Sequence, residues 1–466
     1  MDDSLQTFLR ELTEAKATDP HARDAWRQRA ATIKILSDEA AESIGDAYRQ
    51  MGSDSRLRGV LLTMLAESRS PQATDAYLDL FVTDPLCDSQ DAALAVAPFL
   101  ATDRDSTVLF PRLLEGIEHL STASVILDLA NHVAREGKVD VHPAAGRVQH
   151  LATLLGGVVG QLQRIEEQSA DDASLAQRSA QVSESIALVV ALCDALALIG
   201  DPSVTGKLYQ AMQLRHRRLR AEAAAALARL GDEKGIESLV ELAAEPVVRS
   251  RALSYLDELG SPEAAAAEHR SAAAKAEGDL AVWLADPLQF ASPPGQIELI
   301  DSHAHHWPGY EEAVDCYLFR YVYATEDGLY SGTAIVGPVV FTLRADLDNL
   351  PTEDLYAIFA GWQARHESIR EVDAADANEQ EAAVIGHAET VLRGRGYDAV
   401  QVVRVGYFFE EVVIIATAMR EGGPGTVIVA DDRDEWFPQG SPSRPITPDE
   451  AYWIHKGRKI LKTFNS

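Results

Sequence analysis

The sequence predicts a two-part protein, with an all-helical α-solenoid over residues 1–280 and an α+β domain with a mainly antiparallel sheet over residues 281–466. Short helices rich in Ala and Leu recur between residues 196 and 263 at a period of about 30 residues, which is typical of stacked repeats. Only nine of the 31 aromatic residues precede residue 281. The second part instead carries β-branched and aromatic runs of strand length, punctuated by Gly and Pro.

Composition and charge narrow the class of protein. With 46% hydrophobic and 24% charged residues the chain is ordinarily globular, and its formal net charge of −30 disfavours binding to nucleic acid. The three cysteines are far apart and form no C-x-x-C motif, so a reducing compartment fits best. The first residues carry acid where a secretory signal has a basic region. We therefore expect a cytoplasmic protein without a membrane span.

The repeat in the first part is clearest at three helix ends, where Gly200, Gly231 and Gly260 follow apolar residues. The glycines are 31 and 29 residues apart, and each suits the left-handed position that ends a helix. The following Asp-Pro or Ser-Pro is expected to cap the next helix. The intervening helix Leu219–Leu230 has an apolar face, and such short helices bury that face only by stacking on their neighbours.

These helix ends resemble HEAT repeats, in particular the short HEAT-like type named for phycobilisome lyases, over roughly 65 residues. The resemblance implies a curved surface that binds other proteins. Deoxyhypusine hydroxylase is similar in using HEAT repeats, and there His-Glu dipeptides bind iron. Residues 1–280 contain no His-Glu pair, and nothing beyond the repeat points to a bilin. We therefore expect no cofactor on the solenoid.

The second part reads as strands framed by helices. Tyr317–Tyr323 alternates with period two and has one aromatic face, and the return strand Thr333–Leu343 is interrupted by Gly-Pro. A final helix begins at the capping-box sequence Thr447-Pro448-Asp449-Glu450. The remaining pattern predicts helices over 355–362 and 378–393 and strands over 397–405, 411–419 and 426–430. This half resembles no family known to us.

The main candidate for a metal site is Asp301, His303 and His305, because two imidazoles at alternate strand positions can reach one divalent ion. This pattern resembles the first metal motif of amidohydrolases. Those enzymes are barrels of about 200 residues or more with further His and Asp ligands, and too few residues and histidines follow here. The alternative is a polar loop or strand edge without metal.

Two further patterns have both a functional and a structural interpretation. The acidic run 431–435 follows an apolar strand and has the oxygen ligands that Mg²⁺ or Ca²⁺ prefers; the alternative is a solvated turn before Trp436 and Phe437. Cys316 opens the aromatic strand, and a buried structural thiol is favoured over a nucleophile there. The chain has no G-x-S-x-G, Walker or G-x-G-x-x-G motif.

Basic side chains gather at two places against the acidic background. Arg215, Arg217, Arg218 and Arg220 lie at the expected start of a solenoid helix and form a candidate partner-binding cluster. A second cluster lies on the last helix, at Lys456, Arg458, Lys459 and Lys462. The alternative for both is a solvated face or pairing with acidic neighbours.

The sequence therefore favours a non-catalytic interaction or scaffold protein that uses the solenoid surface, with protein partners rather than nucleic acid or membrane. The alternative is an enzyme or small-ligand-binding protein whose site lies in the C-terminal domain, where the aromatic strand Tyr317–Tyr323 would line a pocket or simply form core. No catalytic set is visible, and the oligomeric state stays open.

Overall fold

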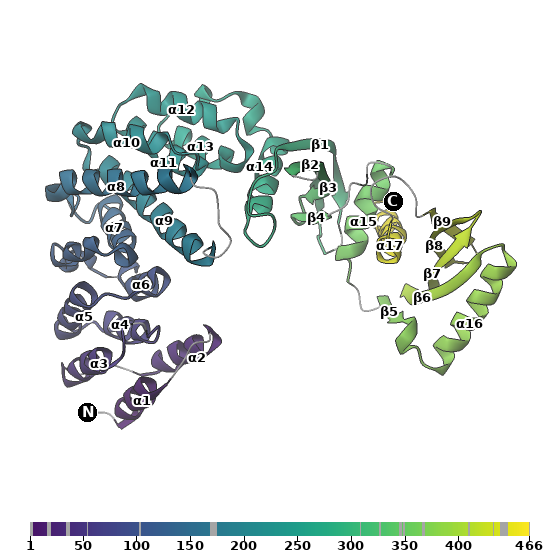
Figure 1. The fold of residues 1–466 in the computed structure, drawn as a ribbon, viewed down its shortest axis with the longest axis horizontal. Helices are drawn as coiled ribbons and strands as arrows, with labels where there is room; N and C mark the ends of the chain where they lie inside the picture. The colour runs from purple at the N-terminus through teal and green to yellow at the C-terminus, as the bar shows by residue number, and fades with distance from the viewer. Residues whose placement is uncertain are drawn as a thin grey trace. The chain divides into compact units, whose positions relative to one another are not determined.

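The computed structural model (Figure 1) consists of two compact units, each of which makes most of its contacts within itself. Unit 1 consists of residues 1–243 and 251–265, and unit 2 of residues 244–250 and 266–466. Helix α14 (Ala272–Ala285) crosses residue 280, where we predicted the boundary, and lies within unit 2. The structure describes residues 3–15, 20–33, 38–53, 55–101, 104–167, 175–307, 309–325, 328–343, 347, 350–365, 369–408, 411–431, 433–438 and 446–465.

The regular elements described in unit 1 are helical, as predicted. Ala- and Leu-rich sequences form them because these residues lose little side-chain freedom in a helix. The α-helices are α1 (Asp3–Glu14), α2 (Pro20–Ala30), α3 (Asp38–Gln50), α4 (Arg58–Glu67), α5 (Pro71–Thr83), α6 (Ser89–Val96), α7 (Leu120–Arg135), α8 (Val148–Glu167), α9 (Leu175–Ile199), α10 (Thr205–Met212), α11 (Arg217–Arg229), α12 (Glu233–Ala243) and α13 (Pro246–Glu258), the last from Arg251 onward.

The three glycines predicted to end helices do so in the structure. Gly200, Gly231 and Gly260 all have positive φ, at 79°, 84° and 70°, in the region that glycine adopts without strain. The caps after them differ from the prediction in one case. The Asp201 side chain accepts from the Ser203 amide and caps a short 3-10 turn before α10, whereas the Ser261 side chain makes no capping hydrogen bond. The chain after Ser261 forms 3-10 turns and not another α-helix.

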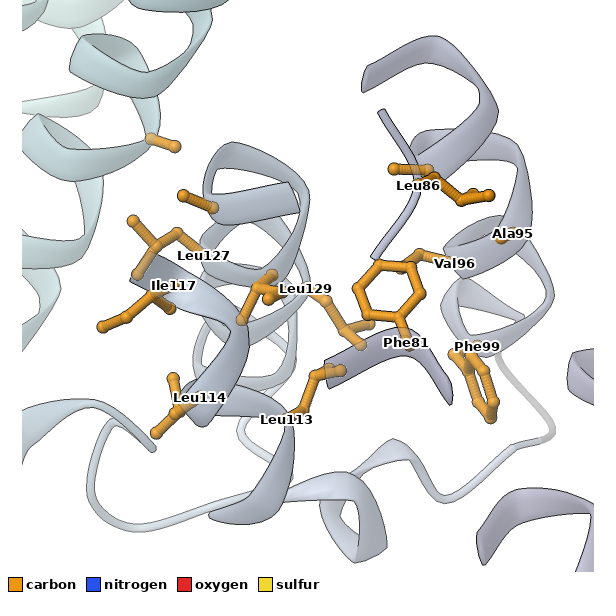
Figure 2. Packing of buried hydrophobic residues seen from close by; sticks show 14 of the residues in the cluster. Phe81, Leu86, Ala95, Val96, Phe99, Leu113, Leu114, Ile117, Leu127 and Leu129 are labelled. Atoms are coloured by element: carbon orange, nitrogen blue, oxygen red, sulfur yellow. The ribbon is translucent and has the colours of Figure 1, made fainter. Parts of the chain in front are cut away.

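One apolar core cluster extends from α1 to α11 of unit 1, and Figure 2 shows part of it. Large side chains fill the space between the early helices: Tyr77 stacks on Phe81 at 5.2 Å between ring centroids and lies 4.9 Å from Phe99. Farther along, Leu113, Leu114, Ile117, Leu127 and Leu129 are fully buried in the same cluster. Each helix stripe is thus covered by its neighbours, as stacked repeats require.

Unit 2 contains two antiparallel sheets, of order β1-β2-β3-β4 and β5-β6-β7-β8-β9. The alternating and β-branched runs form most of the predicted strands. The strands are β1 (Gln296–His306), β2 (Ala313–Thr325), β3 (Gly328–Val336), β4 (Phe341–Leu343), β5 (Ile369–Asp373), β6 (Asp398–Phe408), β7 (Glu411–Arg420), β8 (Gly423–Ala430) and β9 (Arg433–Pro438). Helices α15 (Thr352–Gln363), α16 (Glu379–Gly394) and α17 (Pro448–Phe464) complete the unit, and α17 begins at the predicted capping box.

The sheets and helices of unit 2 form layers. One face of the first sheet, including Phe319, Tyr321 and Tyr323, packs on α14, so the aromatic face of β2 is core. The other face packs on α15 and α17, whose far side meets the second sheet. Helix α16 covers the outer face of the second sheet. The pair α15 and α17 therefore lies between the two sheets (Figure 1).

Unit 2 repeats one arrangement twice, as helix, four strands and helix: α14-β1-β2-β3-β4-α15 and α16-β6-β7-β8-β9-α17. The first strand of each copy has a bulge at the same place, before Asp301 in β1 and before Arg404 in β6. The motif Gly-Thr-x-Ile-Val occurs at residues 332–336 and 425–429, and Tyr-x-Ile-x-x-Gly at residues 356–361 and 452–457. We call the two copies repeat A and repeat B.

The two copies meet where α15 crosses α17, and glycines make this crossing close. A Cβ added at Gly361 would lie 1.9 Å from the carbonyl oxygen of Trp453, and one at Gly457 would lie 1.8 Å from that of Ala357. Each of these residues is 96 positions from its counterpart in the other repeat. The contact is therefore reciprocal, which is typical of a local two-fold relation.

Candidate functional sites

A bulge in β1 decides where the candidate metal residues lie. Strict alternation would put Asp301, His303 and His305 on the same face as Ile297, which packs against α14. The register with β2 shifts between Leu299 and Asp301, so the three residues instead face the side of α15 and α17. Of the two structural alternatives, a loop or a strand edge, the segment is the edge strand β1.

The three residues line a cavity of about 480 Å³ in unit 2. Its walls come from one strand and two helices. They are formed by Asp301, His303 and His305 of β1, Thr352, Glu353 and Tyr356 of α15, and Arg458, Leu461 and Asn465 at the end of α17. Residues far apart in the sequence thus converge on a site with both polar and apolar walls, which is typical of ligand cavities.

Tyr356 of α15 lines this cavity and contacts two of the β1 residues. Its hydroxyl donates to Asp301 Oδ2 at 2.9 Å, and its ring lies 4.5 Å from the His305 ring, edge to face. Burial, together with the hydrogen bond to Asp301, raises the pKa of Tyr356 well above its ordinary value. The phenol therefore stays protonated and fixes one oxygen of the Asp301 carboxylate.

His305 brings an unsatisfied atom to the same place. Its Nε2 is buried and has no hydrogen-bond partner among the residues that the structure describes. Burial lowers the pKa of His305, the nearby His303 ring adds to this, and Asp301 opposes it. At neutral pH the imidazole is uncharged, and a neutral imidazole has one nitrogen that accepts a hydrogen bond.

The geometry does not assemble a metal site from the described residues. Ring centroids of His303 and His305 are 4.7 Å apart, yet no group of three or more His, Cys, Asp or Glu side chains in the described ranges is placed to hold an ion. Metal binding at Asp301, His303 and His305 therefore stays a prediction from sequence, and no reaction step is derived from it.

The basic residues of α17 are largely paired. Arg458 binds Asp354 through Nε at 2.5 Å and Nη2 at 2.7 Å, and its Nη1 contacts Glu435. These bonds raise the pKa of Arg458 well above its ordinary value, although burial opposes the shift. Lys456 pairs with Glu371 at 3.1 Å. The charge of Arg458, which lines the cavity, is thus already neutralised by Asp354 and Glu435.

Of two other predicted motifs, the acidic run differs from its prediction and Cys316 agrees with it. The acidic run 431–435 was read as a metal site or a solvated turn, but Arg433–Pro438 forms strand β9, paired with β8. Asp434 accepts from the Tyr397 hydroxyl at 2.6 Å and pairs with Arg395 at 3.2 Å. Asp432 lies outside the described residues. Cys316 is fully buried, and burial raises its thiol pKa to about 12, as expected of a structural cysteine.

The arginine cluster of unit 1 lies at the start of α11. Arg215, Arg217 and Arg218 are exposed, and Arg220 is half-buried. The Glu166 carboxylate accepts from the amides of Arg215 and His216 at 3.0 and 3.2 Å. This places a negative charge at the positive end of the helix. The side chain of Arg218 lies 3.9 Å from Glu222.

A ladder of ion pairs crosses α7, α9, α11 and α13, and sequence reasoning missed it. Arg135 of α7 pairs with Asp194 of α9, which lies 3.7 Å from Arg229 of α11. Arg229 in turn pairs with Glu258 of α13 at 2.7 Å. We call this set, with Arg218, Glu222 and Arg251, the charge ladder.

The repeat period is the signal that could have found the charge ladder. Glu222 pairs with Arg251 at 2.8 Å and Arg229 with Glu258, and both pairs are separated by 29 residues. This equals the spacing of Gly231 and Gly260. Residues one repeat apart occupy neighbouring helices at the same height, so opposite charges at that spacing predict a contact.

Comparison with known proteins agrees with this repeat. The family model for HEAT repeats matches residues 174–257, which cover α9 to α13. Residues 174–257 of the helical N-terminal part thus form a HEAT-repeat region, and the second part is an α+β domain without a family match. No curated protein matches the chain.

One described helix of the HEAT region has the length and apolar composition of a membrane span. Gln181–Ile199, within α9, is long and apolar enough to cross a bilayer by length and composition, and half of it is buried in the structure. The same composition is expected of a central solenoid helix, which is covered on several sides by its neighbours. Its place inside the HEAT match favours that interpretation.

Proposed function

We propose that the protein is a non-catalytic interaction or scaffold protein that binds a protein partner through its HEAT-repeat surface. The observation that supports this most is the charge ladder. It presents side chains of both signs on four helices in sequence, and Arg135, Arg251 and Glu258 each expose about half of their side chains. Solenoids of this kind use such continuous faces for recognition.

The partner we propose carries exposed charges of both signs. An incoming side chain of the same sign can replace the exposed member of a pair, such as Arg251 or Glu258, and then contacts its less exposed partner. Complementary charge of this kind mainly sets specificity and association rate. The proposal includes a cytoplasmic location, which the free thiols of Cys87, Cys193 and Cys316 support.

Charge reversal on the full-length chain tests this proposal. Proteins retained from native lysate by the wild type would be identified, and the affinity of a purified candidate would then be measured for Glu258→Lys, Arg251→Glu and Glu237→Lys. Glu237 is exposed on α12, within the HEAT match but outside the charge ladder, and serves as the matched control. We expect a loss of at least about 10-fold at the ladder, or about 1.4 kcal/mol, and no change at the control.

Two outcomes would overturn the assignment. In one, the wild type retains no protein stoichiometrically under conditions in which it is folded. In the other, a retained protein binds all three variants with equal affinity, which would place recognition away from the charge ladder.

A further inference from the structure

The duplication in unit 2 creates a second cavity that corresponds to the first. It measures about 280 Å³ and is lined by Arg404 of β6 and by Pro448, Asp449 and Tyr452 of α17. These helix residues are the counterparts, 96 positions later, of Thr352, Glu353 and Tyr356 in the larger cavity. Arg404 follows the bulge of β6 as Asp301 follows the bulge of β1. The two cavities can therefore be compared position by position.

Repeat B carries a cation of its own in the wall of its cavity. The Arg404 guanidinium donates through Nη1 to Asp449 at 2.7 Å and through Nε to Asp373 at 2.9 Å. Glu371 lies 3.6 Å from the same Nη1. The acidic residue in the first turn of α17 is thus satisfied by an internal guanidinium held between carboxylates, which is the geometry that arginine recognises best.

Repeat A has the acids of this arrangement without the cation. Glu353 stands where repeat B has Asp449, and Asp301, a carboxylate, stands where repeat B has Arg404. No ion pair joins Asp301 or Glu353 to a cation among the described residues; Asp301 accepts only from the Tyr356 hydroxyl. Arg458, which shares the wall, is already bound to Asp354 and Glu435. The uncompensated charge of the larger cavity is therefore negative.

We propose that the cavity of repeat A binds the guanidinium group of a ligand, in the place that Arg404 occupies in repeat B. Asp301 and Glu353 supply the carboxylates, and the rings of Tyr356 and His305 supply flat walls on which a planar cation stacks. The unpartnered Nε2 of His305 lies at the same wall. This inference concerns unit 2 and is independent of the function proposed for the HEAT surface.

The two sources of such a group are a free small molecule and an arginine side chain of a peptide. Titration calorimetry of the full-length chain at low salt would use agmatine and L-arginine for the first and an N-acetylated, C-amidated Gly-Arg-Gly peptide for the second. L-citrulline, which replaces the guanidinium by a neutral urea of the same shape, is the control ligand. We expect at least one guanidinium compound to bind at least 10-fold more tightly than citrulline, and the stronger arm identifies the source.

Variants of the chain then locate the bound group. Glu353→Gln and Asp301→Asn each remove one charge with little change in shape and are expected to weaken binding at least 5-fold. Asp301→Arg gives repeat A the internal cation of repeat B and is expected to abolish binding. Glu379→Gln, which removes an exposed acid from the first turn of α16, is the matched control and should bind as the wild type does.

Folding is controlled separately from binding. Glu353 is exposed, so Glu353→Gln tests the proposal even if a change at Asp301 perturbs the fold, which circular dichroism would report. Equal binding of arginine and citrulline, no binding of any guanidinium compound at millimolar concentration, or unchanged binding by both Glu353→Gln and a folded Asp301→Arg chain would each overturn the proposal.

Discussion

The crossing of α15 and α17 is expected to tolerate no side chain at Gly361. An alanine Cβ there would lie 1.9 Å from the Trp453 carbonyl oxygen and 2.7 Å from its carbon. Carbon–oxygen contacts normally begin at about 3.3 Å, so the helices must separate by about 1.4 Å. A gap of 0.5 to 1 Å already forfeits about a quarter to a half of each dispersion contact. Both helices lie in the core between two sheets, where no alternative packing relieves the clash.

The cost of Gly361→Ala is the overpacking penalty less the helix propensity gained. Overpacking of a close-packed core costs about 1–3 kcal/mol and occasionally more, and this contact is at the upper end because backbone atoms meet the added methyl. Alanine regains about 1 kcal/mol over glycine within a helix. The upper end of that penalty, about 3 kcal/mol, less this gain leaves an expected net loss of about 2 kcal/mol, or roughly 4–8 °C in the midpoint of unit 2.

Tryptophan fluorescence during urea unfolding reports mainly on unit 2, because five of the six tryptophans lie there and only Trp26 lies in unit 1. Gly386→Ala is the matched control, since Gly386 is an exposed interior residue of α16 whose added Cβ meets no atom within 4 Å. That variant should gain up to about 1 kcal/mol. If both variants shift the fluorescence midpoint in the same direction and by the same amount, the close crossing does not exist in solution.

Three predictions concern unit 1, each checked by urea unfolding followed by circular dichroism. Arg58→Ala removes a fully buried guanidinium and should cost about 3–5 kcal/mol, against under about 1 kcal/mol for the exposed Arg49→Ala; equal losses would contradict this. Burial lowers the pKa of His142 to about 4, so stability should fall below pH 6.5 as the unfolded chain takes up the proton, and not in His142→Gln. Burial, with Asp194 adding to it, raises the pKa of Asp128 to about 6. Ionisation therefore opposes folding, so the free energy of unfolding should fall as the pH rises from 4 to 6. Asp128→Asn should remove this fall. An unchanged pH profile in either variant would refute the corresponding assignment.

Local sequence patterns account for much of the fold. Gly231 and Gly260 were predicted to end helices from their residue type and their spacing, both visible in the sequence, and their positive φ in the structure confirms this. The capping box at Thr447 and the period-two alternation of Tyr317–Tyr323 were equally local signals. Strand β9 was missed because its first three residues, Arg433 to Glu435, are charged, and pairing with β8 makes them a strand.

The duplication in unit 2 was present in the sequence but needs the structure to be recognised. The motifs at residues 332–336 and 425–429 share only four residues, Gly, Thr, Ile and Val, and the last three are common in strands of any protein. Their equivalence follows from the matching bulges and from the reciprocal contact of Gly361 and Gly457. Without that alignment, Glu353 and Asp449 are unrelated acids on two helices.

The sequence by itself determined that Asp301, His303 and His305 share one face of a strand, because side chains alternate with period two. It did not determine which face. The bulge before Asp301 depends on the hydrogen bonds of β1 with β2, which join residues distant in the chain, and one extra residue turns every later side chain to the opposite side. Tertiary pairing alone therefore brought these residues to Glu353 and Tyr356, since register is a property of two strands and not of either one.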